Sequence, residues 1–356
     1  MSELPSAVSS GSYPIADVTS WATSILGRAG VPQNDARITA EVLVRTDARG
    51  FRTHGLTRLR SYLEKLKSGE VSTAAEITAN INGSYGVVEA NGALGQVAGM
   101  VAVDHAIRAT ETQPLVCVTL RETGHLGALG VLVLRAAEAG RVALMLQATP
   151  PIITMPGVGG PMLGNNPFAI AAPRTNGPPI VIDMACSVAA RGNIVLAARS
   201  GEPIPEGWAV DENGVPTTDA SAALKGALLP FAGHKGLGMS IIVELLAGSL
   251  SGRPFESSLN KGGQVRVAAG NLNAMFIVFN PDLMIGRAAY DAHVCAWTAH
   301  LKAAGKGARV PGERAHAAEM AANSEGLTFQ SDIAKDLRLL GEEYDLPFPT
   351  LLRNQY

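Results

Sequence analysis

Two residues that could move a proton and bind a carboxylate stand four positions apart. They are His54 and Arg58, in the segment Gly50-Phe51-Arg52-Thr53-His54-Gly55-Leu56-Thr57-Arg58. An imidazole whose ordinary pKa is near ~6.5 exchanges a proton at neutral pH, and a guanidinium matches both oxygens of a carboxylate. The pair suits a small 2-oxo or 2-hydroxy acid, whereas a His-Gly pair at a helix start is often only local turn chemistry.

A second histidine, His125, stands in a glycine-rich turn. Gly124, Gly127 and Gly130 follow an expected strand and precede an expected helix, a spacing that lets backbone amides face an anion. Close packing of the helix on the strand is the alternative explanation for these glycines. The Gly-x-Gly-x-x-Gly hexapeptide of doubly wound dinucleotide-binding domains is absent from the sequence. Because the glycine spacing still lets backbone amides face an anion, we expect His125 to lie beside a phosphate or nicotinamide site. A surface histidine is the alternative.

Polar residues also accompany expected strands in the middle of the chain. Asn165 belongs to Gly164-Asn165-Asn166-Pro167, just before a strand, and Asp183 ends the next strand. Turn capping is the alternative role for both residues, because Asn and Asp side chains readily bond to nearby backbone. Arg191 follows on a helix, where it is either a ligand for an anion or a solvated charge.

Two helix starts carry further candidates. Lys235, in Gly233-His234-Lys235-Gly236, is a cation where the helix macrodipole disfavours one, so a bound anion would resolve the conflict. Pro311, Gly312, Glu313 and Arg314 open a later helix, with Glu313 in the favoured first turn.

The sequence gives little support for a metal site or for a serine nucleophile. His293 and His300 are seven residues apart without a carboxylate at ligand spacing, and no Gly-x-Ser-x-Gly elbow occurs. The three cysteines, Cys117, Cys186 and Cys295, have neither a disulfide framework nor a zinc spacing, which fits a reducing cytoplasm. We expect no metal.

The composition indicates a compact globular protein. Its 356 residues are enough for two domains, and a net charge of −2 without a basic stripe argues against a nucleic-acid partner. The N-terminal residues lack the basic and then apolar segments of a signal peptide. The uncharged stretch 142–173 is interrupted by prolines and glycines, so it predicts buried strands and loops and no membrane span. We expect a cytoplasmic location.

Apolar spacing divides the chain into three parts. The first 70 residues are mostly helical, with Thr57 expected to cap a helix that Gly69 closes. A hairpin at Asn82-Gly83 opens a middle part in which strands near 115–120, 142–146, 168–171, 180–183 and 275–279 mix with helices. An exposed turn is expected within 209–217. Helices return beyond Pro281, and we expect the helices of both ends to pack together.

In their order along the chain, these segments resemble the type-2 malate/L-lactate dehydrogenase family. The resemblance covers nearly the whole sequence and rests on Arg52-Thr53-His54-Gly55 with Arg58, Gly124-His125-Leu126-Gly127, Gly164-Asn165-Asn166-Pro167, Asp183-Met184-Ala185, Trp208-Ala209-Val210-Asp211 leading to Gly214, Gly233-His234-Lys235-Gly236 and Pro311-Gly312-Glu313. Each segment alone is unspecific, but seven in one order are specific.

The resemblance implies an α/β (α+β) fold with a mixed, largely antiparallel sheet in a non-Rossmann nicotinamide-binding domain. It implies a discontinuous helical domain built from residues 1–80 and 282–356, and a cofactor- and substrate-binding domain over residues 81–281. It also implies a homodimer with the active site near the interface. The missing glycine hexapeptide agrees with such a cofactor domain.

The implied activity is NAD- or NADP-dependent hydride transfer at C2 of a small 2-hydroxy or 2-oxo acid of the malate, lactate or ureidoglycolate type. By resemblance, His54 and His125 are the candidates for proton transfer, with Thr53 supporting His54. Arg58, Asn165 and Arg191 resemble substrate contacts. The cofactor cradle resembles a longer set, namely His125, Leu126, Gly127, Ala128, Leu129, Asp183, Met184, Ala185, His234, Lys235, Pro311, Gly312, Glu313 and Arg314.

Three departures from the family pattern bear on the substrate. Thr53 stands where many members carry Ser and keeps the hydroxyl, whereas Asn165 stands where Thr is usual. The imine-reducing branch uses an acidic residue near Asn193, and an amide cannot donate a proton in that way. Reduction of a cyclic imine carboxylate, of the piperideine-2-carboxylate type, is therefore the alternative activity. A catalytically silent ligand-binding protein is a third reading, which the intact Thr53-His54 and Lys235 oppose.

Overall fold

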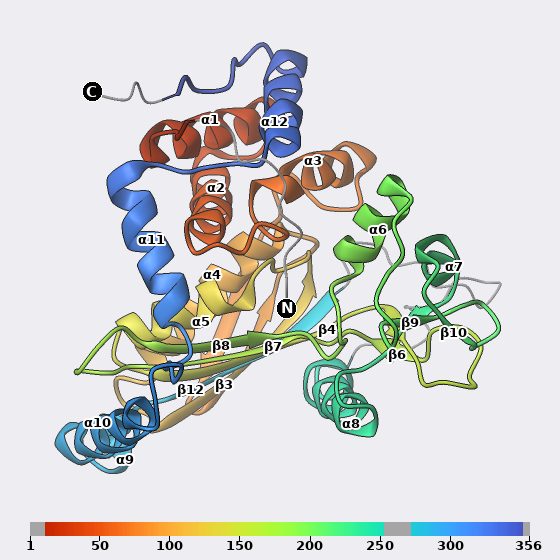
Figure 1. Cartoon of the computed structure of the whole chain (residues 1–356). Helices are drawn as coiled ribbons and strands as arrows, with labels where there is room; N and C mark the ends of the chain where they lie inside the picture. The colour runs from red at the N-terminus through yellow and green to blue at the C-terminus, as the bar shows by residue number, and fades with distance from the viewer. Residues whose placement is uncertain (1–10, 253–271, 352–356) are drawn as a thin grey trace.

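A seven-stranded mixed sheet forms the centre of the computed structural model, which describes residues 11–252 and 272–351 (Figure 1). Its strand order is β1-β2-β3-β12-β4-β7-β8, and every neighbouring pair is antiparallel except β2 and β3. The strands are β1 (Thr78–Asn82), β2 (Tyr85–Glu89), β3 (Leu115–Thr123), β12 (Leu272–Phe279), β4 (Val142–Ala148), β7 (Phe168–Ala172) and β8 (Ile180–Met184). The expected largely antiparallel, non-Rossmann sheet is confirmed.

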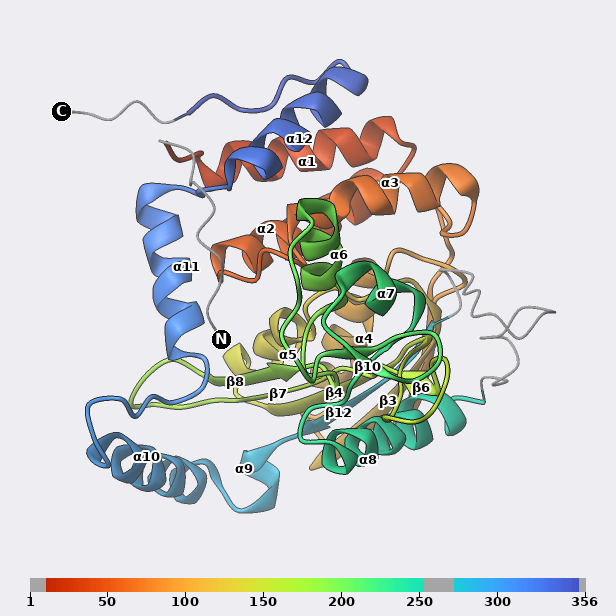
Figure 2. The same ribbon diagram turned by 45° about the vertical axis from the view of Figure 1, so that its right-hand side comes forward.

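The central strands are apolar on both faces because both faces are covered. Helices α4 (Gly95–Ala109) and α5 (Leu129–Glu138) pack on one face, where Val118, Leu120 and Phe276 are fully buried. Helix α8 (His234–Val243) and the π-helical turn η2 (Glu244–Ser249) lie against the other face (Figure 2). A strand buried on both sides gains from near-continuous apolar residues, and this accounts for the sequence of β12.

A smaller five-stranded sheet lies beside the large one, in the order β10-β9-β11-β5-β6. Its strands are β5 (Pro151–Ile153), β6 (Leu163–Gly164), β9 (Ala209–Val210), β10 (Pro216–Thr217) and β11 (Ala227–Leu228), with helices α6 (Arg191–Ser200) and α7 (Ala220–Lys225) nearby. The excursion expected at 209–217 is a hairpin. Glu212 and Asn213 in its turn are exposed, as is Pro216 of the second strand, whereas Ala209 and Val210 of the first strand are fully buried.

Helices from the two ends of the chain share one core. They are α1 (Ile15–Arg28), α2 (Gln33–Ala48), α3 (Leu59–Ser68) and α12 (Ser331–Glu343), with α11 (Glu313–Glu325) descending toward the sheet (Figure 1). The indole N–H of Trp21 donates to the carbonyl of Leu346, 2.8 Å away. Tyr13 and Leu327 exchange backbone hydrogen bonds. The bounds proposed for two domains stay a prediction.

Helices α9 (Pro281–Met284) and α10 (Arg287–Ala303) lie apart from this terminal core, at the far side of the sheet (Figure 1). Val294 of α10 packs with Ile180 and Val310 beside β8. No helix within the described ranges is both long enough and apolar enough to cross a bilayer.

The start of α3 differs from the expectation. A 3-10 turn, η1 (Leu56–Arg58), precedes the helix, and Arg58 occupies the N-cap position without a side-chain cap. The hydroxyl of Thr57 donates instead to the carbonyl of Arg52, so the expected Thr57 cap is wrong. Gly69 does end the helix in the left-handed region, with φ of 74°, as expected for a glycine without a Cβ penalty.

Candidate active site

The two histidines singled out in the sequence lie next to each other. The ring centroids of His54 and His125 are 5.7 Å apart, with 35° between the ring planes. His54 belongs to the loop between α2 and η1, and His125 to the turn between β3 and α5. The site therefore forms where the terminal helices meet the sheet with its covering helices.

Asp47, near the end of α2, fixes the loop that carries His54. The carboxylate of Asp47 accepts the backbone N–H of Leu56 at 2.7 Å. Gly55 is required here, because a Cβ at this position would overlap the Asp47 carboxyl group. Burial raises the pKa of Asp47 to about 7, against the lowering effects of the Leu56 N–H and of the Arg52 charge.

Thr53 and Arg58 flank the His54 ring. The Thr53 hydroxyl lies 2.8 Å from Nδ1 of His54, and Nε of Arg58 donates to the Thr53 carbonyl at 2.8 Å. Within the described residues, the two terminal nitrogens of Arg58 have no protein partner. They remain available to a carboxylate.

The His125 turn is held from several elements. Nδ1 of His125 lies 2.8 Å from the hydroxyl of Tyr62 on α3. Nε2 of Gln96 on α4 donates to that hydroxyl at 3.0 Å and to the His125 carbonyl at 3.2 Å. Gln147 of β4 donates through Nε2 to the Gly124 carbonyl at 3.3 Å and accepts the Leu126 N–H at 3.4 Å.

Both imidazoles are neutral at pH 7. Burial, followed by the charge of Arg58, lowers the pKa of His54 to about 4. Burial also holds the pKa of His125 well below its usual value, with further lowering by His54, Arg58 and Lys65. Neither Arg58 nor Lys65 forms an ion pair in the described part of the chain. An excess of positive charge around two neutral rings attracts a small anion.

The glycine turn packs tightly against β8. The N–H of Gly130 in the first turn of α5 donates to the Asp183 carboxylate at 2.7 Å, and a Cβ on Gly130 would lie 2.9 Å from that oxygen. Burial raises the pKa of Asp183 to about 6. The start of α5, which follows the segment from His125 to Leu129, is thereby joined to Asp183 near the end of β8. The cofactor role of these residues stays a prediction.

Asn165 lies beside the continuation of β8. Its side-chain oxygen accepts the Ser187 N–H at 2.8 Å, and its carbonyl accepts the Cys186 N–H at 2.9 Å. Its neighbour Asn166 is fully buried at φ +37° and bonds to Thr149, Ser240 and Glu244. The Asn165 side chain therefore bonds to backbone 22 residues further along the chain and does not cap its own turn. Its amide nitrogen has no protein partner among the described residues.

The start of α8 adjoins the same segment. Phe231 donates its N–H to the carbonyl of Cys186 and accepts the Gly236 N–H, both at 3.0 Å. His234 and Lys235 are exposed, and α8 begins without a side-chain cap. An uncapped helix start with an adjacent lysine can bind a phosphate.

In the part of the chain that the structure describes, no hydrogen bond or ion pair joins the remaining candidates to the two histidines. Arg191 is exposed at the first position of α6, and no contact joins it to either ring. The turn from Pro311 to Arg314 packs at the beginning of β8, where Pro311 accepts the Val181 N–H at 3.1 Å. Glu313 pairs with Lys302 and Arg174, and these bonds lower its pKa to about 2. The cofactor role of this turn stays a prediction.

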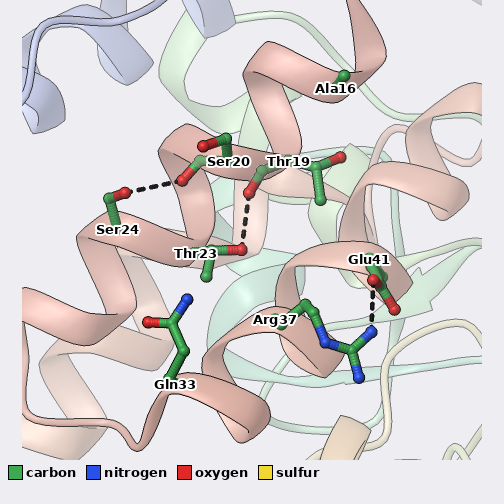
Figure 3. Close-up of a pocket in the computed structure, with 8 residues that line it drawn as sticks. All are labelled: Ala16, Thr19, Ser20, Thr23, Ser24, Gln33, Arg37 and Glu41. Atoms are coloured by element: carbon green, nitrogen blue, oxygen red, sulfur yellow. Dashed lines mark hydrogen bonds and ion pairs between the residues drawn. The ribbon is translucent and has the colours of Figure 1, made fainter.

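A cavity also lies elsewhere, on the outer side of α1 and α2 (Figure 3). It measures about 510 Å³ and contains no histidine. The hydroxyls of Thr19, Thr23 and Ser24 donate to carbonyls of their own helix, while Arg37 pairs with Glu41. None of the sequence-predicted site residues lines it. In the described ranges no three His, Cys, Asp or Glu side chains gather as metal ligands.

Three polar residues around the site were missed in the sequence. Tyr62 fits the apolar spacing of α3, with Leu59, Leu63 and Leu66, so the spacing concealed its hydroxyl. Gln96 is a polar residue in an otherwise apolar stretch and offered a weak signal. Lys65 lies at i+7 from Arg58, on the same face of the helix as Tyr62, and this spacing could have indicated it.

Comparison with known proteins identifies relatives along nearly the whole chain. The profile described as malate/L-lactate dehydrogenase matches residues 13–338. A Delta(1)-pyrroline-2-carboxylate/Delta(1)-piperideine-2-carboxylate reductase of Pseudomonas aeruginosa is 36% identical, covering 92% of this chain and 98% of the relative. A (2R)-3-sulfolactate dehydrogenase (NADP(+)) of Chromohalobacter salexigens is 35% identical, covering 83% and 88%.

Solved structures agree with this result. The sulfolactate dehydrogenase from Methanocaldococcus jannaschii superposes with a TM-score of 0.80 at 29% identity, covering 95% of this chain and 98% of that protein. The resemblance noted in the sequence is therefore confirmed in both sequence and fold.

Proposed function

The chain belongs to the malate/L-lactate dehydrogenase family of oxidoreductases, and we propose that it transfers a hydride reversibly between a nicotinamide and C2 of a small 2-hydroxy or 2-oxo carboxylic acid. One observation carries this proposal. The ring centroids of the neutral His54 and His125 side chains lie 5.7 Å apart, beside Arg58, whose terminal nitrogens have no partner among the described residues. Proton exchange and carboxylate binding are what oxidation of a hydroxy acid needs besides the hydride acceptor.

The cofactor is NAD or NADP, in line with relatives named for one or the other. When bound, it supplies or accepts the hydride. The residues present fit such a group, because the uncapped start of α8 with exposed Lys235 can hold a phosphate. We assign the cradle to His125 to Leu129, Asp183 to Ala185, His234, Lys235 and the turn from Pro311 to Arg314.

The substrate is held by the chain's own polar groups. Arg58 binds the carboxylate through its two terminal nitrogens. The histidines serve the hydroxyl group, with Thr53 fixing the His54 ring through Nδ1. The amide nitrogen of Asn165 and the guanidinium of Arg191 complete the substrate contacts in this proposal.

Reduction of a cyclic imine carboxylate is the second candidate. It is favoured by the 36% identity to the reductase from Pseudomonas aeruginosa over 92% of the chain. Against it, Asn193 in the first turn of α6 carries an amide, which cannot donate a proton to an imine nitrogen as a carboxylic acid does.

A spectrophotometric panel tests the two candidates. Absorbance of NADH and NADPH is followed with malate-, lactate- and ureidoglycolate-type oxo acids and with piperideine and pyrroline carboxylates. Oxidation with an oxo acid supports the first candidate, and oxidation with imines alone supports the second. Thermal stabilisation by NADH compared with NADPH identifies the preferred cofactor, since a ligand bound only to the folded state raises its stability. No response to any compound contradicts both candidates.

We further propose that the protein is a cytoplasmic homodimer, as the family resemblance implies. Exposed apolar side chains on α8 and η2, those of Ile241, Ile242 and Leu245, support a subunit contact, because such clusters commonly mark interfaces. Light scattering after size exclusion should give twice the mass of one chain. A monomer at micromolar concentration would contradict this.

A further inference from the structure

Tyr62 has a polar role that its place in the core conceals. It is only 3% exposed and lies on the inward face of α3, yet its hydroxyl contacts Nδ1 of His125 at 2.8 Å and Nε2 of Gln96 at 3.0 Å. Gln96 is fully buried. Gln96, Tyr62 and His125 therefore form a closed chain of hydrogen bonds, and the proton positions along it can be worked out.

The orientation of Gln96 is set by a backbone carbonyl. The side-chain atom 3.2 Å from the His125 carbonyl must carry hydrogen, because a carbonyl oxygen only accepts. That atom is Nε2, and its other hydrogen is directed to the Tyr62 hydroxyl. The opposite orientation would bring Oε1 against the His125 carbonyl with no proton between them. In the adopted orientation Oε1 is buried without a partner among the described residues.

The Tyr62 hydroxyl has a single proton to give. Because Gln96 donates to its oxygen, that proton is directed to Nδ1 of His125. Burial raises the pKa of Tyr62 to about 12, so the hydroxyl keeps its proton at neutral pH. Nδ1 of His125 is consequently an acceptor, and the proton of the neutral ring resides on Nε2.

We propose that Tyr62 and Gln96 are positioning residues that hold His125 as the Nε2–H tautomer. His125 then presents a neutral N–H donor at the site, while His54, supported by the Thr53 hydroxyl, exchanges the proton. This division of labour rests on the proposed function, whereas the tautomer itself follows from the free protein. A neutral imidazole can stabilise a developing negative charge on a substrate oxygen by hydrogen bonding.

Nitrogen-15 NMR of the histidine side chains in the ligand-free, full-length protein tests the proposal. Long-range proton–nitrogen correlation distinguishes protonated from unprotonated ring nitrogens, and the His125→Gln variant assigns the His125 signals. We expect an unprotonated Nδ1 and a protonated Nε2 in the wild type at pH 7. In Tyr62→Phe, which removes only the hydroxyl, both signals should move toward the average of the two tautomers.

Tyr85→Phe is the matched control, because the partner of the Tyr85 hydroxyl among the described residues is Thr119, at 3.3 Å. It should leave the His125 signals unchanged. A protonated Nδ1 in the wild type overturns the proposal even if Tyr62→Phe does not fold, and so do unchanged signals in a folded Tyr62→Phe. Since no substrate or cofactor is present, this outcome is independent of whether the proposed reaction occurs.

A kinetic measurement separates positioning from general support of the fold. Tyr62→Phe should lower kcat by about 10-fold while KM for the acid stays within twofold, because Arg58 still holds the carboxylate. Tyr85→Phe should change neither constant. A Tyr62→Phe enzyme with wild-type kcat would overturn the role of this tautomer in the reaction.

Discussion

Gly55 lies directly against the carboxyl group of Asp47, so that the loop carrying His54 closes only because residue 55 has no side chain. The same carboxylate accepts the N–H of Leu56 at 2.7 Å. The end of α2 thereby sets the position of the catalytic candidate His54 through a contact that any Cβ at residue 55 would break.

Gly55→Ala should therefore displace the loop. Overpacking at a tight contact typically costs about 1–3 kcal/mol of folding stability, and kcat should fall by at least about 10-fold. Adding Asp47→Ala to Gly55→Ala should restore part of the lost stability and part of the lost kcat. In a double-mutant cycle, the double variant should then be less impaired than the sum of the two single variants. Gly27→Ala is the control, because a Cβ there meets nothing within 4 Å. Wild-type melting temperature and kcat in Gly55→Ala would refute the contact.

The raised pKa of Asp47 should be visible in the pH dependence of folding stability. Its pKa rises from 3.8 when exposed to about 7 in the folded state, so the folded state binds the proton more tightly. Folding stability therefore declines as pH increases from about 4 through about 7. Asp47→Asn removes this contribution, and its melting temperature relative to the wild type should rise over that interval. A difference that is independent of pH would contradict the raised pKa.

Removing either imidazole should impair turnover. General acid–base groups typically contribute about 10²–10⁴-fold, so we expect kcat losses in this range for His54→Ala and smaller losses for His125→Ala if His125 only donates a hydrogen bond. His293→Ala, on the exposed side of α10, should be neutral. Near-normal turnover in both site variants would reject the assignment.

The pH profile distinguishes His54 from an ordinary histidine. Its pKa of about 4 means that the proton-accepting form persists as the pH falls. The kcat/KM for hydroxy acid oxidation should stay level from pH 7 to 5 and decline only near pH 4. Arg58→Met removes the second cause of the lowering, and its acidic limb should move upward. A wild-type limb near ~6.5, the ordinary histidine value, would contradict the buried, cation-flanked environment.

Arg58 should act mainly on substrate affinity. Arg58→Ala should raise KM for the acid strongly, and Arg58→Lys should recover only part of the loss, because an ammonium group cannot form the paired bonds of a guanidinium. Arg37→Ala, whose exposed side chain pairs with Glu41 on α2, controls for loss of a surface charge. An unchanged KM in Arg58→Ala would place the carboxylate elsewhere.

Local patterns predicted much of this structure, and long-range contacts account for the rest. Apolar spacing predicted the helices of the first 70 residues, and Asn82-Gly83 predicted the β1–β2 hairpin, because both patterns depend on neighbouring residues. The insertion of β12 between β3 and β4 depends on pairing across more than a hundred residues, which no local signal encodes.

The same distinction applies to the site. His54 and His125 could be selected because the chain has only seven histidines, and Arg58 because it stands four residues from His54. Tyr62 could not, since its spacing is that of a core residue and its role depends on a histidine from another segment. The Thr57 cap failed because the hydroxyl found the carbonyl of Arg52 in a 3-10 turn, an alternative that the helical pattern does not reveal.

Hydride transfer itself is tested most directly with a nicotinamide that carries two deuterium atoms at C4. The labelled reduced cofactor is incubated with the protein and the best 2-oxo acid of the panel, and the product is analysed by mass spectrometry and proton NMR. We predict a hydroxy acid with one deuterium at C2, formed in proportion to the cofactor oxidised, and its loss in His54→Ala. A product without deuterium at C2, or cofactor oxidation that yields no hydroxy acid, would contradict the proposed reaction.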